Sequence, residues 1–126
     1  MKFVFILISL FLAFNAIAME RNIVTEQRKV RMINVKLSSA GVVSGLDKFH
    51  VTGTKTGTGT YEIVPTKIFA RDVQSIAIPN TSVCSVKSIT DTTSKVTVVT
   101  ANADHTTVKD CAFNLAIIGS DTVEVN

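Results

Sequence analysis

The side chains that could do chemistry in this chain are few and widely spaced. His50 and His105 are the only histidines. Asp104 and His105, with Asp110 a few residues further on, could hold a metal ion, but their spacing matches no standard metal site. A single histidine in a polar loop is more often simply solvated. The sequence therefore predicts no metal site and no cofactor.

The residue patterns of several enzyme classes are missing. A serine nucleophile would need a Gly-x-Ser-x-Gly elbow, and a glycosidase would need a close pair of carboxylates. A cysteine nucleophile would need Cys84 or Cys111 to stay reduced. Gly53, Gly57 and Gly59 fit neither a P-loop nor a dinucleotide fingerprint, because a strand follows them rather than a helix. We expect a protein that is not an enzyme and has no catalytic residue.

The first 18 residues have the pattern of a secretory signal peptide. Lys2 gives a positive start, residues 3–14 are almost entirely apolar, and Ala16 and Ala18 supply the small residues of a cleavage site. The apolar run is shorter than the ~20 residues that cross a bilayer. We expect cleavage after residue 18, no membrane span, and a secreted or extracytoplasmic product, extracellular or periplasmic.

The composition limits the class of protein and of partner. A chain of 126 residues suits one domain, and 46% hydrophobic with 18% charged residues excludes a disordered chain. The net charge is +3, and part of that surplus leaves with Lys2. The basic residues are scattered apart from Arg28, Lys29 and Arg31, which we interpret as a solvated edge. We expect no nucleic-acid partner.

Cys84 and Cys111 are the only cysteines, and both lie in the predicted mature chain. An exported chain with two cysteines most simply forms one disulfide bond. The alternative is two buried free thiols. The bond would close a loop of about 28 residues, which in the chain-entropy model stabilises the fold by roughly 3.5 kcal/mol. We predict the disulfide.

After the leader, the chain is rich in Thr, Val and Ser and alternates between apolar and polar residues, which indicates β-strands. We expect a short edge strand at 42–43 and a further strand at 73–78. For the other strands, the alternation predicts these inward-facing sets: Ile33, Val35 and Leu37; Phe49 and Val51; Tyr61 and Ile63; Cys84 and Val86; Val96 and Val98; Cys111, Phe113, Leu115 and Ile117.

Turn signals separate the strands. We expect a hairpin turn at residues 55–57 and a strand end at Pro65. Residues 66–72 should form a loop whose Ile68 and Phe69 both pack beneath the sheets. Residues 119–121 should interrupt the last strand before a short final one at 123–125.

Together these elements predict an all-β fold, an antiparallel β-sandwich, jelly-roll-like, of about seven to eight short strands after a cleaved signal peptide. The expected organisation is a signal peptide at 1–18, an N-terminal arm at 19–29 and the sandwich domain at 30–126. Asn80-Thr81-Ser82 is an N-glycosylation sequon in a predicted turn. It matters only in a eukaryotic secretory pathway.

Residues 48–63, KFHVTGTKTGTGTYEI, resemble a hairpin of small β-sandwich modules in phage tail-fibre tips and in bacterial secreted or surface proteins. Phe69, the stretch 76–79, the stretch 96–98 and the stretch 112–119 follow in a similar order. H-type lectins are looser relatives. The resemblance implies an antiparallel sandwich, often trimeric, concerned with adhesion or recognition. The chain departs from the pattern at Arg71, where a proline is usual, and it has no Trp for a sugar platform.

The expected function is a secreted, non-enzymatic binding or adhesion module that recognises a surface glycan (carbohydrate) or a protein partner. One alternative is a structural subunit of a surface or fibre assembly, as a homotrimer, and another is a hydrolase with an unrecognised site. A rigid sandwich presents its loops for contact. The candidate ligand-binding residues therefore lie on three predicted loops: Lys55, Thr56 and Thr58; Lys67 and Arg71; Asn102, Asp104 and His105.

Overall fold

The computed structural model describes residues 27–123. Its contacts divide the chain into a unit of Val30–Asp121 and a second unit of Met1–Lys29 with Thr122–Asn126, of which only 27–29 and 122–123 are described. The predicted signal peptide and most of the predicted N-terminal arm lie outside the described residues. Among the described residues, no helix is long and apolar enough to cross a membrane.

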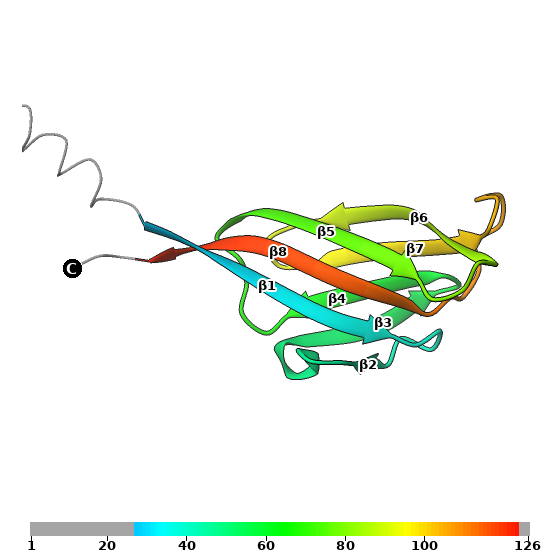
Figure 1. The fold of residues 1–126 in the computed structure, drawn as a ribbon, viewed down its shortest axis with the longest axis horizontal. Helices are drawn as coiled ribbons and strands as arrows, with labels where there is room; N and C mark the ends of the chain where they lie inside the picture. Colours follow the sequence, from blue (N-terminus) through cyan, green and yellow to red (C-terminus); the bar gives the residue numbers. More distant parts are fainter. Residues whose placement is uncertain (1–26, 124–126) are drawn as a thin grey trace, which may run out of the picture. The chain divides into compact units, whose positions relative to one another are not determined.

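The described chain forms two four-stranded antiparallel sheets (Figure 1). Sheet A has the order β2-β1-β8-β5, with these bounds: β2 Val43–Ser44, β1 Gln27–Leu37, β8 Phe113–Val123 and β5 Arg71–Pro79. Sheet B has the order β3-β4-β7-β6, with these bounds: β3 Val51–Gly57, β4 Thr60–Pro65, β7 Val96–Asn102 and β6 Cys84–Asp91. A short 3-10 helix, η1, spans Lys48–His50. The predicted all-β sandwich is confirmed.

The connections gather at the two ends of the sandwich. The chain crosses between the sheets after β2, β4, β5 and β7, so that β4 pairs with β7 and β5 pairs with β8. The loops 38–42, 58–59, 80–83 and 103–112 lie at one end, which we call the disulfide end, and the loops 66–70 and 92–95 lie at the opposite end (Figure 1).

The alternation of the strands builds a single apolar layer between the sheets. All but two of the predicted inward-facing sets are buried as expected: Ile33, Val35 and Leu37; Tyr61 and Ile63; Val96 and Val98; Cys111, Phe113, Leu115 and Ile117. Tyr61 and Phe113 pack edge to face with ring centroids 5.2 Å apart, a favourable aromatic geometry. The β4, β7 and β8 strands therefore supply the centre of the core.

A bulge in β6 follows the predicted inward set of Cys84 and Val86, both of which are half-buried. The pairing of β6 with β7 shifts between Val86 and Ser88, and such a shift changes which residues face the core. Val86 packs against the core before the bulge, as predicted, and Ile89 packs against it after the bulge.

Two predictions about aromatic and aliphatic packing were wrong. Phe49 lies in η1 and is 81% exposed, because the chain enters β3 only at Val51 and the alternation does not extend back through a helical turn. Ile68 is 61% exposed whereas Phe69 is 2% exposed. These two residues are adjacent in the sequence, and only Phe69 points into the core.

The predicted hairpin turn was placed too early. β3 continues to Gly57 and the turn falls at Thr58 and Gly59. Gly59 has a φ of +63°, the left-handed conformation that favours glycine. A Cβ on Gly59 would also lie 2.6 Å from the carbonyl oxygen of Thr100. The positive φ therefore belongs to Gly59, whereas Gly57 lies at a shift in the register between β3 and β4.

Gly119 does not interrupt the last strand, contrary to expectation. β8 runs through residues 119–121 to Val123. A Cβ on Gly119 would lie 2.2 Å from the ring of Phe69, so the absent side chain makes room for that ring. The expected short strand at 123–125 is replaced by the continuation of β8 to Val123, and residues 124–126 lie outside the described residues.

Arg31 closes the sandwich over Phe69 rather than lying in a solvated edge. Its guanidinium carbon is 4.0 Å from the centroid of the Phe69 ring. Its Nε donates to Asp121 at 2.9 Å, and its Nη2 donates to the carbonyl oxygens of Lys67 and Ile68 at 2.8 and 3.1 Å. One side chain therefore ties β1 and β8 to the loop that carries Phe69.

The predicted disulfide is confirmed. Cys84 and Cys111 are bonded, with their Cα atoms 6.2 Å apart. Cys84 begins β6 in sheet B, and Cys111 lies just before β8 in sheet A. The bond therefore joins the two sheets at the end where the longest loop leaves β7.

Replacing Gly119 by Ala should destabilise the fold, because the added methyl group collides with the Phe69 ring. Overpacking of this kind costs about 1–3 kcal/mol. Urea denaturation measures the change in the free energy of unfolding. Gly57→Ala is the matched control, since nothing lies within 4 Å of its would-be Cβ. The addition of Phe69→Leu to Gly119→Ala should recover part of the loss. Equal unfolding midpoints for Gly119→Ala and the wild type would contradict this packing.

Candidate functional site

The structure places the predicted ligand-binding residues at both ends of the sandwich. Six of them belong to the disulfide end: Lys55, Thr56, Thr58, Asn102, Asp104 and His105 (Figure 1). Lys67 and Arg71 belong to the opposite end, in and just after the loop 66–70. A single ligand of ordinary size therefore does not contact all of the predicted residues.

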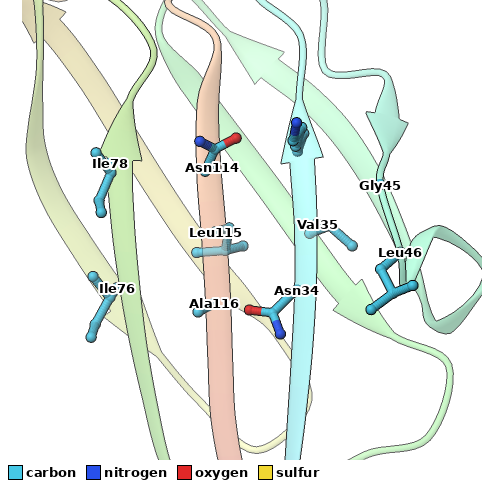
Figure 2. A pocket seen from close by; sticks show the side chains of 10 residues that line it. Asn34, Val35, Gly45, Leu46, Ile76, Ile78, Asn114, Leu115 and Ala116 are labelled. Atoms are coloured by element: carbon cyan, nitrogen blue, oxygen red, sulfur yellow. The ribbon is translucent and has the colours of Figure 1, made fainter.

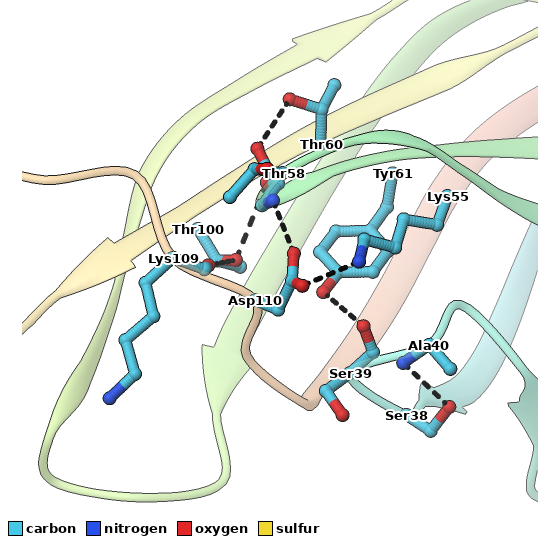
Figure 3. Close-up of polar contacts among 11 residues, drawn as sticks. Ser38, Ser39, Ala40, Lys55, Thr58, Thr60, Tyr61, Thr100, Lys109 and Asp110 are labelled. Carbon is cyan, nitrogen blue, oxygen red and sulfur yellow. Dashed lines mark hydrogen bonds and ion pairs between the residues drawn. The ribbon is translucent and has the colours of Figure 1, made fainter.

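At the disulfide end, Asp110 binds the longest loop to β3 and to the turn between β3 and β4 (Figure 3). One carboxylate oxygen accepts a hydrogen bond from Lys55 Nζ at 2.5 Å, and the other accepts from the Gly59 backbone N–H at 2.7 Å. The Lys55 bond lowers the pKa of Asp110 and raises the pKa of Lys55 from their ordinary values. Lys55 is therefore engaged within the protein.

Beneath Asp110, polar groups seal the core. The Tyr61 hydroxyl donates to the carbonyl oxygen of Ser39 at 2.8 Å, and burial raises the pKa of Tyr61 (Figure 3). Thr100 is fully buried and its hydroxyl donates to the Lys109 carbonyl oxygen at 2.6 Å. These bonds satisfy polar groups that would otherwise be costly to bury.

The loop after β7 satisfies its own polar side chains. Asn102 donates from its amide nitrogen to the Thr106 hydroxyl at 3.0 Å. The Thr106 hydroxyl donates to Asp104 at 2.6 Å, and this bond lowers the pKa of Asp104. The side-chain oxygen of Asn102 accepts the Thr107 N–H at 3.1 Å. Most of the hydrogen-bonding capacity of Asn102 and Asp104 is therefore used inside the loop.

A serine and a histidine meet at the base of this loop. Ser85 Oγ lies 3.1 Å from His105 Nδ1 and donates its proton to the Asn102 carbonyl oxygen at 2.6 Å. The serine proton is thus directed at a carbonyl oxygen, whereas a serine nucleophile would donate it to its base. His105 has a φ of +63°, so the pair fixes a strained turn.

The acidic residues considered for a metal site do not converge. Asp104 faces Thr106, and Asp110 faces Lys55 and Gly59. Within residues 27–123, no group of three His, Cys, Asp or Glu side chains could hold a metal ion.

A different surface, the outer face of sheet A, is hollowed into an apolar groove of about 470 Å³ (Figure 2). Ile76 and Ile78 of β5 form one wall, and Leu46 lies on the other side. Ile76 pairs with Ala116 and Ile78 pairs with Asn114 across to β8. The small side chain of Ala116 leaves the hollow between Ile76 and Asn34 of β1 (Figure 2).

The groove exists because β5 places its larger apolar side chains outward. Ile76 and Ile78 are 59% and 60% exposed, while Ser75 and Ala77 alternate with them on the less exposed, inward set. A strand that only needed stability would bury the isoleucines. We refer to Ile76, Ile78, Ala116 and Leu46 as the outer-face groove. The residues of 73–78 alone predict no inward face, because Val73 lies on one parity and Ile76 and Ile78 lie on the other.

Three polar side chains border the outer-face groove: Asn34, Lys36 and Asn114. Lys36 is the charged member of the lining. Within the described part of the chain, no hydrogen bond or ion pair engages the side chains of Lys36 and Asn114. A mostly apolar hollow with a few convergent polar groups has the general character of a binding site.

Replacing Asp110 by Asn should reduce the acid sensitivity of the fold. The pKa of Asp110 is lowered by folding, so its contribution is present above the ordinary carboxyl pKa of about 3.9 and is lost as the pH falls through the folded value. Urea unfolding from pH 7 down to pH 2 should therefore show a shallower acid-side loss for Asp110→Asn. Lys55→Met added to Asp110→Asn should change little further. An unchanged acid limb in Asp110→Asn would contradict this role.

Comparisons of the chain with protein-family models, with curated proteins and with solved structures found no match. The resemblance to tail-fibre and surface modules therefore stays a prediction, and the case for a function depends on the geometry above.

Proposed function

We propose that the chain is a non-enzymatic, exported binding module whose outer-face groove contacts an acidic, aliphatic segment of another protein. The observation that carries the proposal is that β5 turns its larger apolar side chains, Ile76 and Ile78, to solvent beside Ala116. Clustered exposed apolar residues bordered by polar ones are typical of protein-interaction surfaces. The disulfide between Cys84 and Cys111 is compatible with an extracytoplasmic location.

The lining favours a protein over a glycan. The groove is lined by aliphatic side chains and contains no aromatic ring. The sequence has no Trp, and its single tyrosine, Tyr61, is buried. Of the polar loop residues expected to contact a glycan, Asn102 and Asp104 are engaged within their own loop through Thr106. A glycan would therefore find no aromatic ring in the groove and few unused polar groups on these two residues.

The positive charge of Lys36 at the groove indicates that the partner carries an acidic group. Lys36 lies at its border without an ion pair among the described residues. An acidic group opposite Lys36 would give orientation and a faster association rate. An aliphatic segment with one acidic residue matches both the isoleucines and Lys36.

Selection of a random-peptide library against the folded, oxidised chain tests this function. We expect selected peptides rich in Leu, Ile or Val with an acidic residue. The double variant Ile76→Ser/Ile78→Ser should weaken their binding by about tenfold or more, since lost apolar contact exceeding ~1.4 kcal/mol corresponds to that factor.

Matched controls separate the groove from general exposure. Ile68→Ser/Val83→Ser changes two residues of similar exposure, 61% and 58%, outside the groove and should preserve binding. Lys36→Glu should weaken binding more than Lys87→Glu. Full binding by Ile76→Ser/Ile78→Ser would overturn the proposal. A dimer or trimer in light scattering that this variant dissociates would instead assign the face to self-assembly.

A further inference from the structure

The turn between β5 and β6 presents a short polar segment at the disulfide end. Pro79 ends β5, and the Asn80 N–H donates to the Ala112 carbonyl oxygen at 3.1 Å. The Cys84 N–H donates to the Thr81 carbonyl oxygen at 3.3 Å and closes the turn. Asn80, Thr81 and Ser82 are all exposed. The backbone of this segment is held at both ends while its side chains face solvent.

These side chains have the order that N-linked glycosylation requires. An Asn followed two residues later by Ser or Thr, with no proline between them, is the acceptor sequence, and Asn80, Thr81 and Ser82 satisfy it. Within residues 27–123, no hydrogen bond engages the side-chain amide of Asn80. A bulky, solubilising glycan at this position would be accommodated without moving the core.

We propose that Asn80 is an acceptor for an N-linked glycan when the chain passes through a eukaryotic secretory pathway. The donor is a lipid-linked oligosaccharide diphosphate. A bond forms between Asn80 Nδ2 and C1 of the first sugar, and the bond between C1 and the phosphate oxygen breaks. The lipid diphosphate leaves with the electron pair, and Nδ2 releases one proton.

A glycan at Asn80 would border the outer-face groove. The bond from Asn80 to Ala112 continues the β5–β8 ladder one step past the pair of Pro79 and Phe113. Asn80 is therefore two ladder positions beyond Ile78, and residues two apart in a strand share a face. The first sugars would shield the Ile78 end of the groove and leave the Leu46 side open.

The experiment expresses the full chain in insect or mammalian cells and measures the intact mass of the secreted protein. We expect a mass increase that peptide N-glycosidase F removes, with Asn80 converted to Asp in the peptide mass spectrum. Asn80→Gln and Ser82→Ala should each abolish the increase, whereas Ser82→Thr should retain it. Asn114→Gln, an exposed asparagine outside any sequon, should leave the increase unchanged.

Secreted, disulfide-bonded chain whose Asn80 is unmodified would overturn the proposal. Failure here would leave the peptide-binding test of the groove unaffected, because that test uses the unglycosylated chain.

Discussion

The packing of the Phe69 ring against Gly119, beneath the guanidinium of Arg31, is the contact on which the sandwich most depends. The apolar layer between two sheets must be shielded from water at the ends, where loops pass from one sheet to the other. Phe69 fills that space because Gly119 has no side chain, and Arg31 binds Asp121 and the loop that carries the ring. β1, β8 and the crossing loop are thereby fixed relative to one another.

The disulfide end is closed by a covalent bond and by polar contacts rather than by an aromatic ring. The bond between Cys84 and Cys111 joins the sheets, and Asp110 binds Lys55 and the Gly59 turn. The side chains of Asn102, Asp104 and Asp110 there are bonded within the protein, which leaves few of their polar groups for a ligand. The surface that is not needed for closure is the outer face of sheet A, where Ile76 and Ile78 are exposed.

The sequence was most informative where alternation and core burial coincide, as at Ile33 and Phe113, both buried as predicted. The predictions failed where the role of a residue depends on a contact with a residue far away in the sequence. Gly119 predicts a break in the strand, but its missing side chain makes room for the ring of Phe69, fifty positions earlier in the chain. Phe49 fits the alternating pattern, but a helical turn takes it out of the strand. The groove was not predicted because its walls come from β1, β5 and β8. These strands are known to be neighbours only once the order of strands in the sheet is known.

We infer that the outer face of sheet A is open to solvent and available for a partner. Methyl NMR of the isolated chain with a soluble paramagnetic agent measures this exposure. The methyl signals of Ile76 and Ile78 should be attenuated as strongly as those of the exposed Ile68, while those of the buried Ile117 should resist. Protection of Ile76 and Ile78 to the level of Ile117 would show that the face is already covered and would contradict its role as a binding surface.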